Sequence, residues 1–290
     1  MAPILITGAT GSTGRATIKH LLQKGLAVRA LVHKEDDRSR QLEAQGAEVV
    51  VGDLLDLRSV RRAFEGIKRA YFVYPVRPGL IDASAIFAQA ATEAKAEFIV
   101  NMSQITARPD APSNAALNHW LAERVFDWAG TPVTHLRPTI FHGWLIFAGK
   151  MIREEDRFAV PFSPSGKFAS VSTKDLGEFT ATLLENPAGH AGQTYPLFGP
   201  TELTPSEIAS VLSKHLGREI RYEKVSASVL IRSFTGIEIP YLEQHFDAAT
   251  GMHHDGLLAG TNDWFEKIIG HPSQSLEEFV EENKSVWEKK

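Results

Sequence analysis

Cysteine is absent from this sequence. With no cysteine among its 290 residues, the chain can form neither a disulfide framework, nor a thiolate nucleophile, nor a cysteine-based zinc site. Such a chain tolerates a reducing environment, and we expect a cytoplasmic protein. The sequence also lacks a His-Glu-x-x-His motif and a cluster of carboxylates with metal-ligand spacing, which argues against a metal site.

An excess of positive charge and long apolar runs are missing as well. The 31 lysine and arginine residues face 35 aspartate and glutamate residues, which gives a formal net charge of -4. A protein that holds nucleic acid through its phosphates needs a basic excess, so we expect neither DNA nor RNA as a direct ligand. The most apolar later stretch, 140–152, is too short to span a bilayer. The first residues lack the basic region of a signal peptide, and we expect no membrane association.

Short apolar segments alternate with helical patterns over the first half of the sequence. Strands are predicted at 4–6, 27–32, 48–51, 70–74, 98–102 and 133–136. Helices are predicted between them, beginning near Ser12 and continuing at 36–45, 57–64, 81–94 and 114–129. This order predicts a parallel sheet with helices on both faces, the doubly wound α/β class of the Rossmann fold.

The alternation changes after Pro138. Residues 141–167 carry aromatics, glycine and proline without the earlier pattern, whereas 175–184 and 193–197 fit a helix and a strand that return to the first sheet. Capping boxes at Thr204 and Ser275 open later helices. We therefore predict an NADP-binding Rossmann domain of residues 1–140 plus about 168–198. A smaller, mostly helical substrate domain would comprise 141–167 plus 199–290.

Glycines at positions 8, 11 and 14 follow the first predicted strand directly. In a strand-turn-helix unit, such glycines let the backbone turn tightly, approach a pyrophosphate and pack the helix on the strand. The helix that starts near Ser12 would present free N–H groups and a positive dipole to the phosphates. A glycine-rich turn without a ligand is the alternative. The context favours a dinucleotide-binding loop, because it starts a βαβ unit.

The end of the second predicted strand indicates which dinucleotide binds. An acidic residue there would accept hydrogen bonds from the ribose hydroxyls of NAD, but His33 and Lys34 occupy this place. Arg15 follows the third glycine, so cationic groups can converge on a 2′-phosphate, and NADP(H) is favoured over NAD(H). The alternative for Lys34 is a solvated loop charge. Asp53 would accept from the adenine amino group, or it caps the next helix.

Several motifs resemble those of the NmrA-like family, atypical members of the short-chain dehydrogenase/reductase superfamily. They are Thr7-Gly8-Ala9-Thr10-Gly11-Ser12-Thr13-Gly14-Arg15, Val51-Gly52-Asp53-Leu54, the segment 130–138 with Leu136-Arg137-Pro138, and Tyr195-Pro196-Leu197-Phe198-Gly199-Pro200. The resemblance implies that the residues after the fourth and fifth strands lie beside the nicotinamide. The cofactor-binding residues predicted from the loop, the strand ends and the resemblance are Thr7, Gly8, Thr10, Gly11, Ser12, Thr13, Gly14, Arg15, His33, Lys34, Asp53, Leu54, Tyr74, Pro75, Val76, Ser103 and Pro138.

The catalytic pair of ordinary superfamily members is missing. They reduce carbonyls with Tyr-x-x-x-Lys, in which the lysine helps the tyrosine to donate a proton, yet none of the five tyrosines here is followed by lysine four residues later. Hydride transfer then suits an acceptor that needs little proton donation, such as a quinone, whose reduction leaves a delocalised phenolate. An activated alkene or imine stays open. The resemblance implies the same choice, since NmrA-like proteins include NADPH-dependent quinone reductases and non-catalytic redox sensors.

Ser103, His119 and Trp120 are the candidate catalytic residues. Ser103 follows the fifth strand, and the other two lie on the helix that supplies the chemistry in related enzymes. Each has a structural alternative: Ser103 as a cap, His119 as a satisfied structural group and Trp120 as a space-filling side chain. Tyr74 likewise fits a core aromatic. Residues 141–144 either line an aromatic pocket or belong to the domain interface.

We thus expect an NADPH-dependent oxidoreductase that reduces a small conjugated acceptor. The alternative is a redox-sensing regulator that binds NADP(H) and acts through a protein partner. The sequence leaves open whether the chain forms a homodimer.

Overall fold

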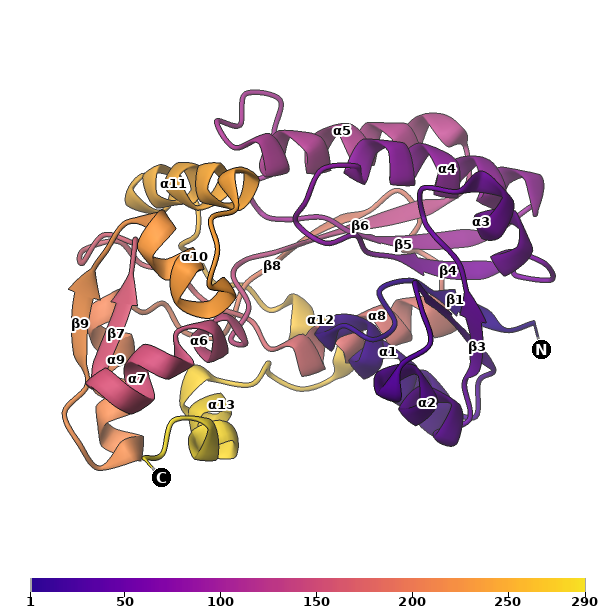
Figure 1. Ribbon diagram of the computed structural model, residues 1–290. Coiled ribbons are helices and arrows are strands. Elements are labelled where there is room, and N and C mark those ends of the chain that lie inside the picture. Colours follow the sequence, from indigo (N-terminus) through magenta and orange to yellow (C-terminus); the bar gives the residue numbers. More distant parts are fainter. Residues whose placement is uncertain (1, 290) are drawn as a thin grey trace.

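The computed structural model describes residues 2–289. Seven parallel strands form one sheet in the order β3-β2-β1-β4-β5-β6-β8, and Figure 1 shows this sheet between two layers of helices. The strands are β1 (Ile4–Ile6), β2 (Val28–Val32), β3 (Glu48–Val51), β4 (Arg69–Phe72), β5 (Phe98–Met102), β6 (Val133–Pro138) and β8 (Thr194–Leu197). The strand order reverses between β1 and β4, which is where ligands bind in this class of sheet. The predicted doubly wound α/β fold is confirmed.

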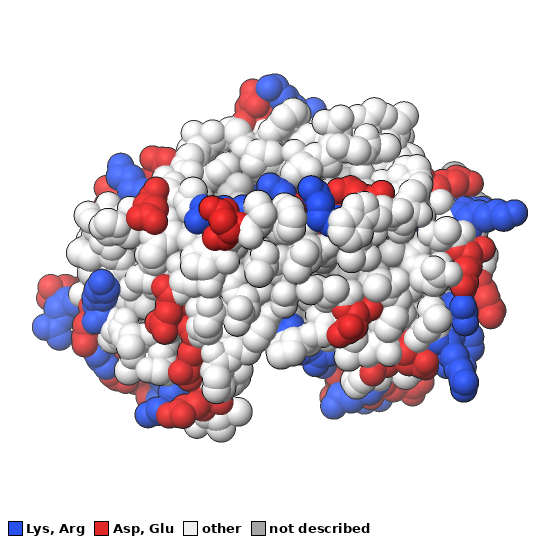
Figure 2. All heavy atoms as spheres, turned by 90° about the horizontal axis from the view of Figure 1, so that it is seen from above, with Lys and Arg blue, Asp and Glu red and all other residues white. Residues whose placement is uncertain are grey.

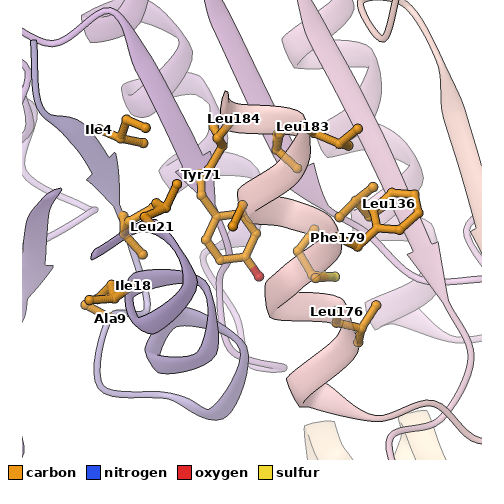
Figure 3. Packing of buried hydrophobic residues seen from close by; sticks show 14 of the residues in the cluster. Ile4, Ala9, Ile18, Leu21, Tyr71, Leu136, Leu176, Phe179, Leu183 and Leu184 are labelled. Atoms are coloured by element: carbon orange, nitrogen blue, oxygen red, sulfur yellow. The ribbon is translucent and has the colours of Figure 1, made fainter. Parts of the chain in front are cut away.

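Two apolar cores hold the helices against the two faces of the sheet. The helices concerned are α1 (Ser12–Gln23), α2 (Asp37–Ala44), α3 (Leu57–Ala63), α4 (Leu80–Glu93), α5 (Asn114–Ala129) and α8 (Thr173–Glu185). Phe87 of α4 and Phe126 of α5 pack in one core, and Leu21 of α1 and Phe179 of α8 pack in the other. Figure 3 shows the second core, where side chains of α1 and α8 meet those of the strands.

Helices α1 and α8 approach each other closely at a glycine. A Cβ on Gly177 of α8 would lie 2.3 Å from the Cβ of Ala16 and 2.7 Å from the backbone nitrogen of Thr17. Only glycine therefore fits at this crossing. The contact fixes α1, and with it the start of the glycine loop, relative to the sheet.

The remaining elements build a smaller lobe with its own core. They are α6 (Trp144–Phe147), α7 (Gly149–Glu155), β7 (Arg157–Val160), α9 (Pro205–Leu216), β9 (Arg221–Lys224), α10 (Ala227–Thr235), α11 (Pro240–His254), α12 (Trp264–Ile269), α13 (Leu276–Asn283) and a 3₁₀ turn (Lys284–Val286). Trp144, Phe158, Leu212 and Trp287 pack together in the core of this lobe. Phe265 of α12 packs instead in the core of the seven-stranded sheet. The domain division at 141–167 and 199–290 stays a prediction.

The smaller lobe contains a two-stranded parallel sheet that the sequence did not indicate. Strand β7 pairs with β9, with Phe158 opposite Tyr222. Strand β9 reads Arg-Tyr-Glu-Lys and is largely exposed, so it has no apolar run or clear alternation by which it could be recognised. The capping boxes at Thr204 and Ser275 form as expected.

Candidate active site

Three positions of the loop after β1 have little or no room for a side chain. Gly8 has a φ of +53°, and a Cβ there would lie 2.5 Å from Cγ1 of Val73. A Cβ on Gly14 would lie 2.3 Å from the carbonyl oxygen of Gly8, and one on Gly11 would lie 3.1 Å from the same oxygen. The Gly11 amide donates to that oxygen across 2.8 Å. Helix α1 consequently starts directly on the backbone of the loop.

Helix α1 also begins without a side-chain cap. Gly11 stands at its N-cap, whereas Asp36, Asp56, Ser113 and Ser172 cap the helices α2, α3, α5 and α8. The first amides of a helix have no partner within the helix. Those of α1 therefore remain available to an anion, and the helix dipole adds a positive potential there. A cradle that a Cβ would fill, next to uncapped amides, fits a dinucleotide diphosphate.

Two of the predicted cofactor side chains are turned into the protein. The Thr7 hydroxyl donates to the carbonyl oxygen of Val73 (3.1 Å) and accepts from its amide (2.8 Å). The Thr13 hydroxyl accepts from the Tyr71 hydroxyl at 3.0 Å. Both side chains thus connect the loop to β4, and only their backbone atoms can face a ligand. Thr10 is half-buried and Ser12 is exposed.

The predicted 2′-phosphate residues lie on the surface. Arg15, His33 and Lys34 are exposed, and among residues 2–289 none of them forms a side-chain hydrogen bond or ion pair. Arg38 differs, because its Nη2 lies 2.6 Å from Oδ2 of Asp36. The carboxylate of Asp53 accepts from the amide of Leu55 at 2.9 Å. Leu54 is half-buried.

The segment after β4 combines a buried tyrosine with exposed neighbours. Tyr74 is 4% exposed, packs in the core beneath α4, and donates its hydroxyl to the carbonyl of Pro78 at 3.2 Å. Pro75 and Val76 are exposed. Pro138 ends β6 and its carbonyl accepts from the amide of Ile105 at 2.9 Å. A contact of these residues with the nicotinamide stays a prediction.

Ser103 lies at the carboxyl edge of the sheet with an unused hydroxyl. The residue is 4% exposed and its amide donates to the carbonyl of Leu136 at 2.7 Å. Within residues 2–289, its buried Oγ has no hydrogen-bond partner, and neither has Nε2 of Gln104. Buried polar groups without partners are rare and call for an explanation. A ligand at this edge of the sheet would supply one.

His119 and Trp120 lie in the second turn of α5. His119 is 7% exposed, and its ring forms no hydrogen bond within the described residues. Burial, with a smaller contribution from the charge of His245, lowers the pKa of His119 to about 4. The imidazole is therefore neutral at neutral pH. Trp120 is half-buried, and the Arg124 guanidinium lies 5.7 Å from the centre of its ring.

Sequence reasoning did not recognise the ion pair that connects α5 to β6. Glu123 is fully buried, and Nε of Arg137 donates to its Oε1 at 2.8 Å while Nη2 donates to Oε2 at 2.5 Å. A bidentate pair of this kind fixes the orientation of α5 on the sheet. Its only sequence signal was the Leu136-Arg137-Pro138 motif. His142 and Trp144 are both buried, and Trp144 packs in the core of the smaller lobe.

The surface is hollowed beside this carboxyl edge. Figure 2 shows an indentation between the smaller lobe and the lobe that carries the seven-stranded sheet.

Within residues 2–289 there is no group of three histidine or carboxylate side chains placed to hold a metal ion. No helix in the same range is long and apolar enough to cross a bilayer.

The comparisons with known proteins agree with this geometry. A model of the NmrA-like family matches residues 2–280. The chain belongs to this family. It is 29% identical over 282 residues to an NAD(P)H azoreductase of Xenophilus azovorans, with 96% of each protein covered. It is 26% identical over 284 residues to quinone oxidoreductase 2 of Escherichia coli (strain K12), with 96% of this chain and 97% of the relative covered.

Solved structures of such enzymes superpose over nearly the whole chain. The NADPH-dependent quinone oxidoreductase of Escherichia coli in complex with NADPH gives a TM-score of 0.85 at 25% identity and covers 97% of this chain and 99% of its own. The triphenylmethane reductase of Citrobacter sp. in complex with NADP(H) gives 0.83 at 26% identity, with 96% and 99% covered. The negative transcriptional regulator NmrA, at 18% identity, shares the fold. The expectation of an NmrA-like oxidoreductase that uses a nicotinamide cofactor is confirmed.

Proposed function

We propose that the protein is an NADPH-dependent reductase that transfers hydride to a quinone or a similar conjugated acceptor without a Tyr-x-x-x-Lys pair. The observation that carries this proposal is the composition of α5, which contains neither tyrosine nor lysine. Its candidate group His119 has a pKa lowered to about 4 and is a neutral imidazole at pH 7. Such a group donates a hydrogen bond but gives up its proton reluctantly.

The chemistry of the acceptor follows from this weak proton donor. Bound NADPH would supply the hydride, and the amides at the start of α1 would hold its diphosphate. A simple ketone would become a strongly basic alkoxide and would need an acid beside it, whereas a reduced quinone delocalises its charge. The unpartnered Ser103 hydroxyl and the His119 ring are the groups that would border the acceptor. Names of relatives such as azoreductase and quinone oxidoreductase support the same class of acceptor.

The preference for NADPH rests on the free cations near the loop. Arg15 and Lys34 would pair with the 2′-phosphate, because neither forms an ion pair with a carboxylate among the described residues. The nearby acid Asp36 is committed to Arg38 and to the first amides of α2. It is therefore not free to accept from the ribose hydroxyls of NADH.

Steady-state loss of NADPH absorbance with a panel of quinones, an azo dye and a simple ketone tests the proposal. We expect turnover with the conjugated acceptors and little with the ketone. Gly14→Ala is the matched control, since its Cβ would strike the Gly8 carbonyl and should remove cofactor binding measured by calorimetry. Tight NADPH binding without turnover on any acceptor would contradict the proposal, and is the behaviour expected of a redox-sensing regulator.

A further inference from the structure

Helix α11 of the smaller lobe docks on the start of α5. Figure 1 shows the two helices beside each other at the top of the molecule. The amide of Asn114 donates to Oε1 of Gln244 at 3.0 Å, and Nε2 of Gln244 donates to the carbonyl of Pro112 at 2.8 Å. Nδ2 of Asn118 donates to the Tyr241 hydroxyl at 3.2 Å. The contact is thus built from specific hydrogen bonds at the end of α5 that carries His119.

His245 is anchored in this contact through one ring nitrogen. Its Nδ1 lies 2.7 Å from the hydroxyl of Ser113. Ser113 is fully buried and caps α5 by accepting from the amide of Ala116 at 3.2 Å. Since the hydroxyl is buried and no other acceptor for its proton is present among residues 2–289, it donates to Nδ1. The proton of the neutral His245 ring is therefore on Nε2.

The second nitrogen of His245 is left free. Nε2 forms no hydrogen bond within the described part of the chain, and the residue is half-buried rather than fully buried. Burial lowers the pKa of His245 to about 4, which keeps the ring neutral at pH 7. An anchored, uncharged ring with an unused N–H is a preorganised hydrogen-bond donor.

His245 lies near His119. Side chains of a helix lean toward its N-terminus, so the His119 ring covers the turn that adjoins Ser113. Protonation of His245 would also lower the pKa of His119, as expected for two rings that are near each other. This junction joins the two lobes at the carboxyl edge of the sheet, where ligands of open α/β sheets bind.

We propose that His245, which no sequence motif had indicated, binds the acceptor by donating a hydrogen bond from Nε2 to its oxygen or nitrogen. This inference rests on the proposed reductase function. As the acceptor receives the hydride, negative charge grows on that atom, and the fixed N–H stabilises it. The proton that completes the reduction comes from solvent, so His245 neither gains nor loses a proton. The smaller lobe then contributes a binding residue as well as the wall of the site.

The test compares three variants with the whole protein, using a quinone as acceptor. His245→Phe keeps a planar ring without the donor, and we expect kcat/KM for the quinone to fall by roughly tenfold to a hundredfold, the effect of losing a hydrogen bond to a charged group. His245→Gln places an amide N–H near the position of Nε2 and should recover most of this loss. Gln244→Ala weakens the same docking contact without removing the donor, and its effect should be smaller. The Kd for NADPH, measured by calorimetry, should change in none of them.

The outcomes separate the two proposals. If the unchanged protein turns over no acceptor, the reductase function fails. If it reduces quinones and His245→Phe does so with equal kcat/KM, only the role of His245 fails. Equal losses in His245→Phe, His245→Gln and Gln244→Ala would also overturn that role, because they would indicate docking alone. Should His245→Phe not fold by circular dichroism, Ser113→Gly decides. It keeps an acceptable N-cap but releases Nδ1, and wild-type kcat/KM in this variant would refute the proposal.

Discussion

Lys34 and Arg15 are exposed cations without partners in the described chain, and their substitution tests the cofactor preference. Changing either to alanine should lower the ratio of kcat/KM for NADPH over NADH by about tenfold or more, since a charge-assisted hydrogen bond contributes about 1.5–3 kcal/mol. Arg38→Ala is the control. Its guanidinium is held by Asp36, so the ratio should change little. The reverse pattern, with Arg38 decisive and the other two silent, would contradict the assignment.

At this scale the sequence located the loop but not the direction of its side chains. Thr7, Thr13 and Tyr74 stay predicted cofactor-binding residues, and their hydroxyls are hydrogen-bonded to Val73, Tyr71 and Pro78. A motif fixes which residues form a turn, whereas the orientation of the Thr7 and Thr13 hydroxyls depends on partners that are distant in the sequence. Thr7 bonds Val73, 66 residues away, and Thr13 bonds Tyr71, 58 residues away. His245 was missed for the same reason, because its partners lie on another element.

Two glycines in helices test how closely elements pack. Gly177→Ala should force α1 and α8 apart, since the new Cβ would lie 2.3 Å from that of Ala16, and overpacking of this kind costs about 1–3 kcal/mol of unfolding free energy. NADPH affinity should fall with it, because α1 carries the loop. Gly251→Ala in α11 is the matched control. It is exposed with nothing within 4 Å of its Cβ, and we expect a gain of about 0.5–1 kcal/mol. Similar shifts in the denaturant midpoints of both variants would refute this packing argument.

The elements of the large sheet were predictable because each buries an apolar stretch. The predicted helix at 114–129 coincides with α5, and the predicted strands at 4–6, 48–51 and 98–102 coincide with β1, β3 and β5. The other strands and helices of this sheet differ from prediction by a few residues at their ends. Strand β9 was not predictable, because its four residues are mostly polar and pair only with β7. A local sequence pattern identifies elements that bury one face. It does not identify a short strand whose partner is distant in the sequence: Arg221 of β9 pairs with Arg157 of β7, 64 residues earlier.

For the whole molecule, buried histidines should set the response to acid. Burial lowers the pKa of His119, His142, His245 and His253 to about 4, whereas in the unfolded chain it is about 6.5. The unfolded state thus binds more protons between these values, and stability falls as pH drops from 6.5 toward 4. Each histidine contributes up to about 1.4 kcal/mol per pH unit. The raised pKa of the exposed His271 opposes this trend weakly.

Denaturant unfolding at several pH values between 7.5 and 4.5 measures this dependence. The His253 ring packs against the rings of Phe162 and Phe168, and His253→Leu removes one titrating group from the core of the smaller lobe. The slope of unfolding free energy against pH should become shallower in this variant by about 1.4 kcal/mol per unit at most. An unfolding free energy that does not change with pH in this window would show that the histidines are protonated in the folded protein.

Because the chain returns to the large sheet as β8, a truncated fragment of the protein can lose part of that sheet. Strand β8 forms the outer strand beside β6, and Tyr195 and Leu197 complete the core that α8 also fills. A fragment ending near residue 140 would leave β6 as a bare edge, with unpaired amides and carbonyls and an uncovered apolar face. Such a fragment should aggregate rather than bind nucleotide. A fragment meant to keep the seven-stranded sheet intact therefore has to extend past Leu197, where β8 ends.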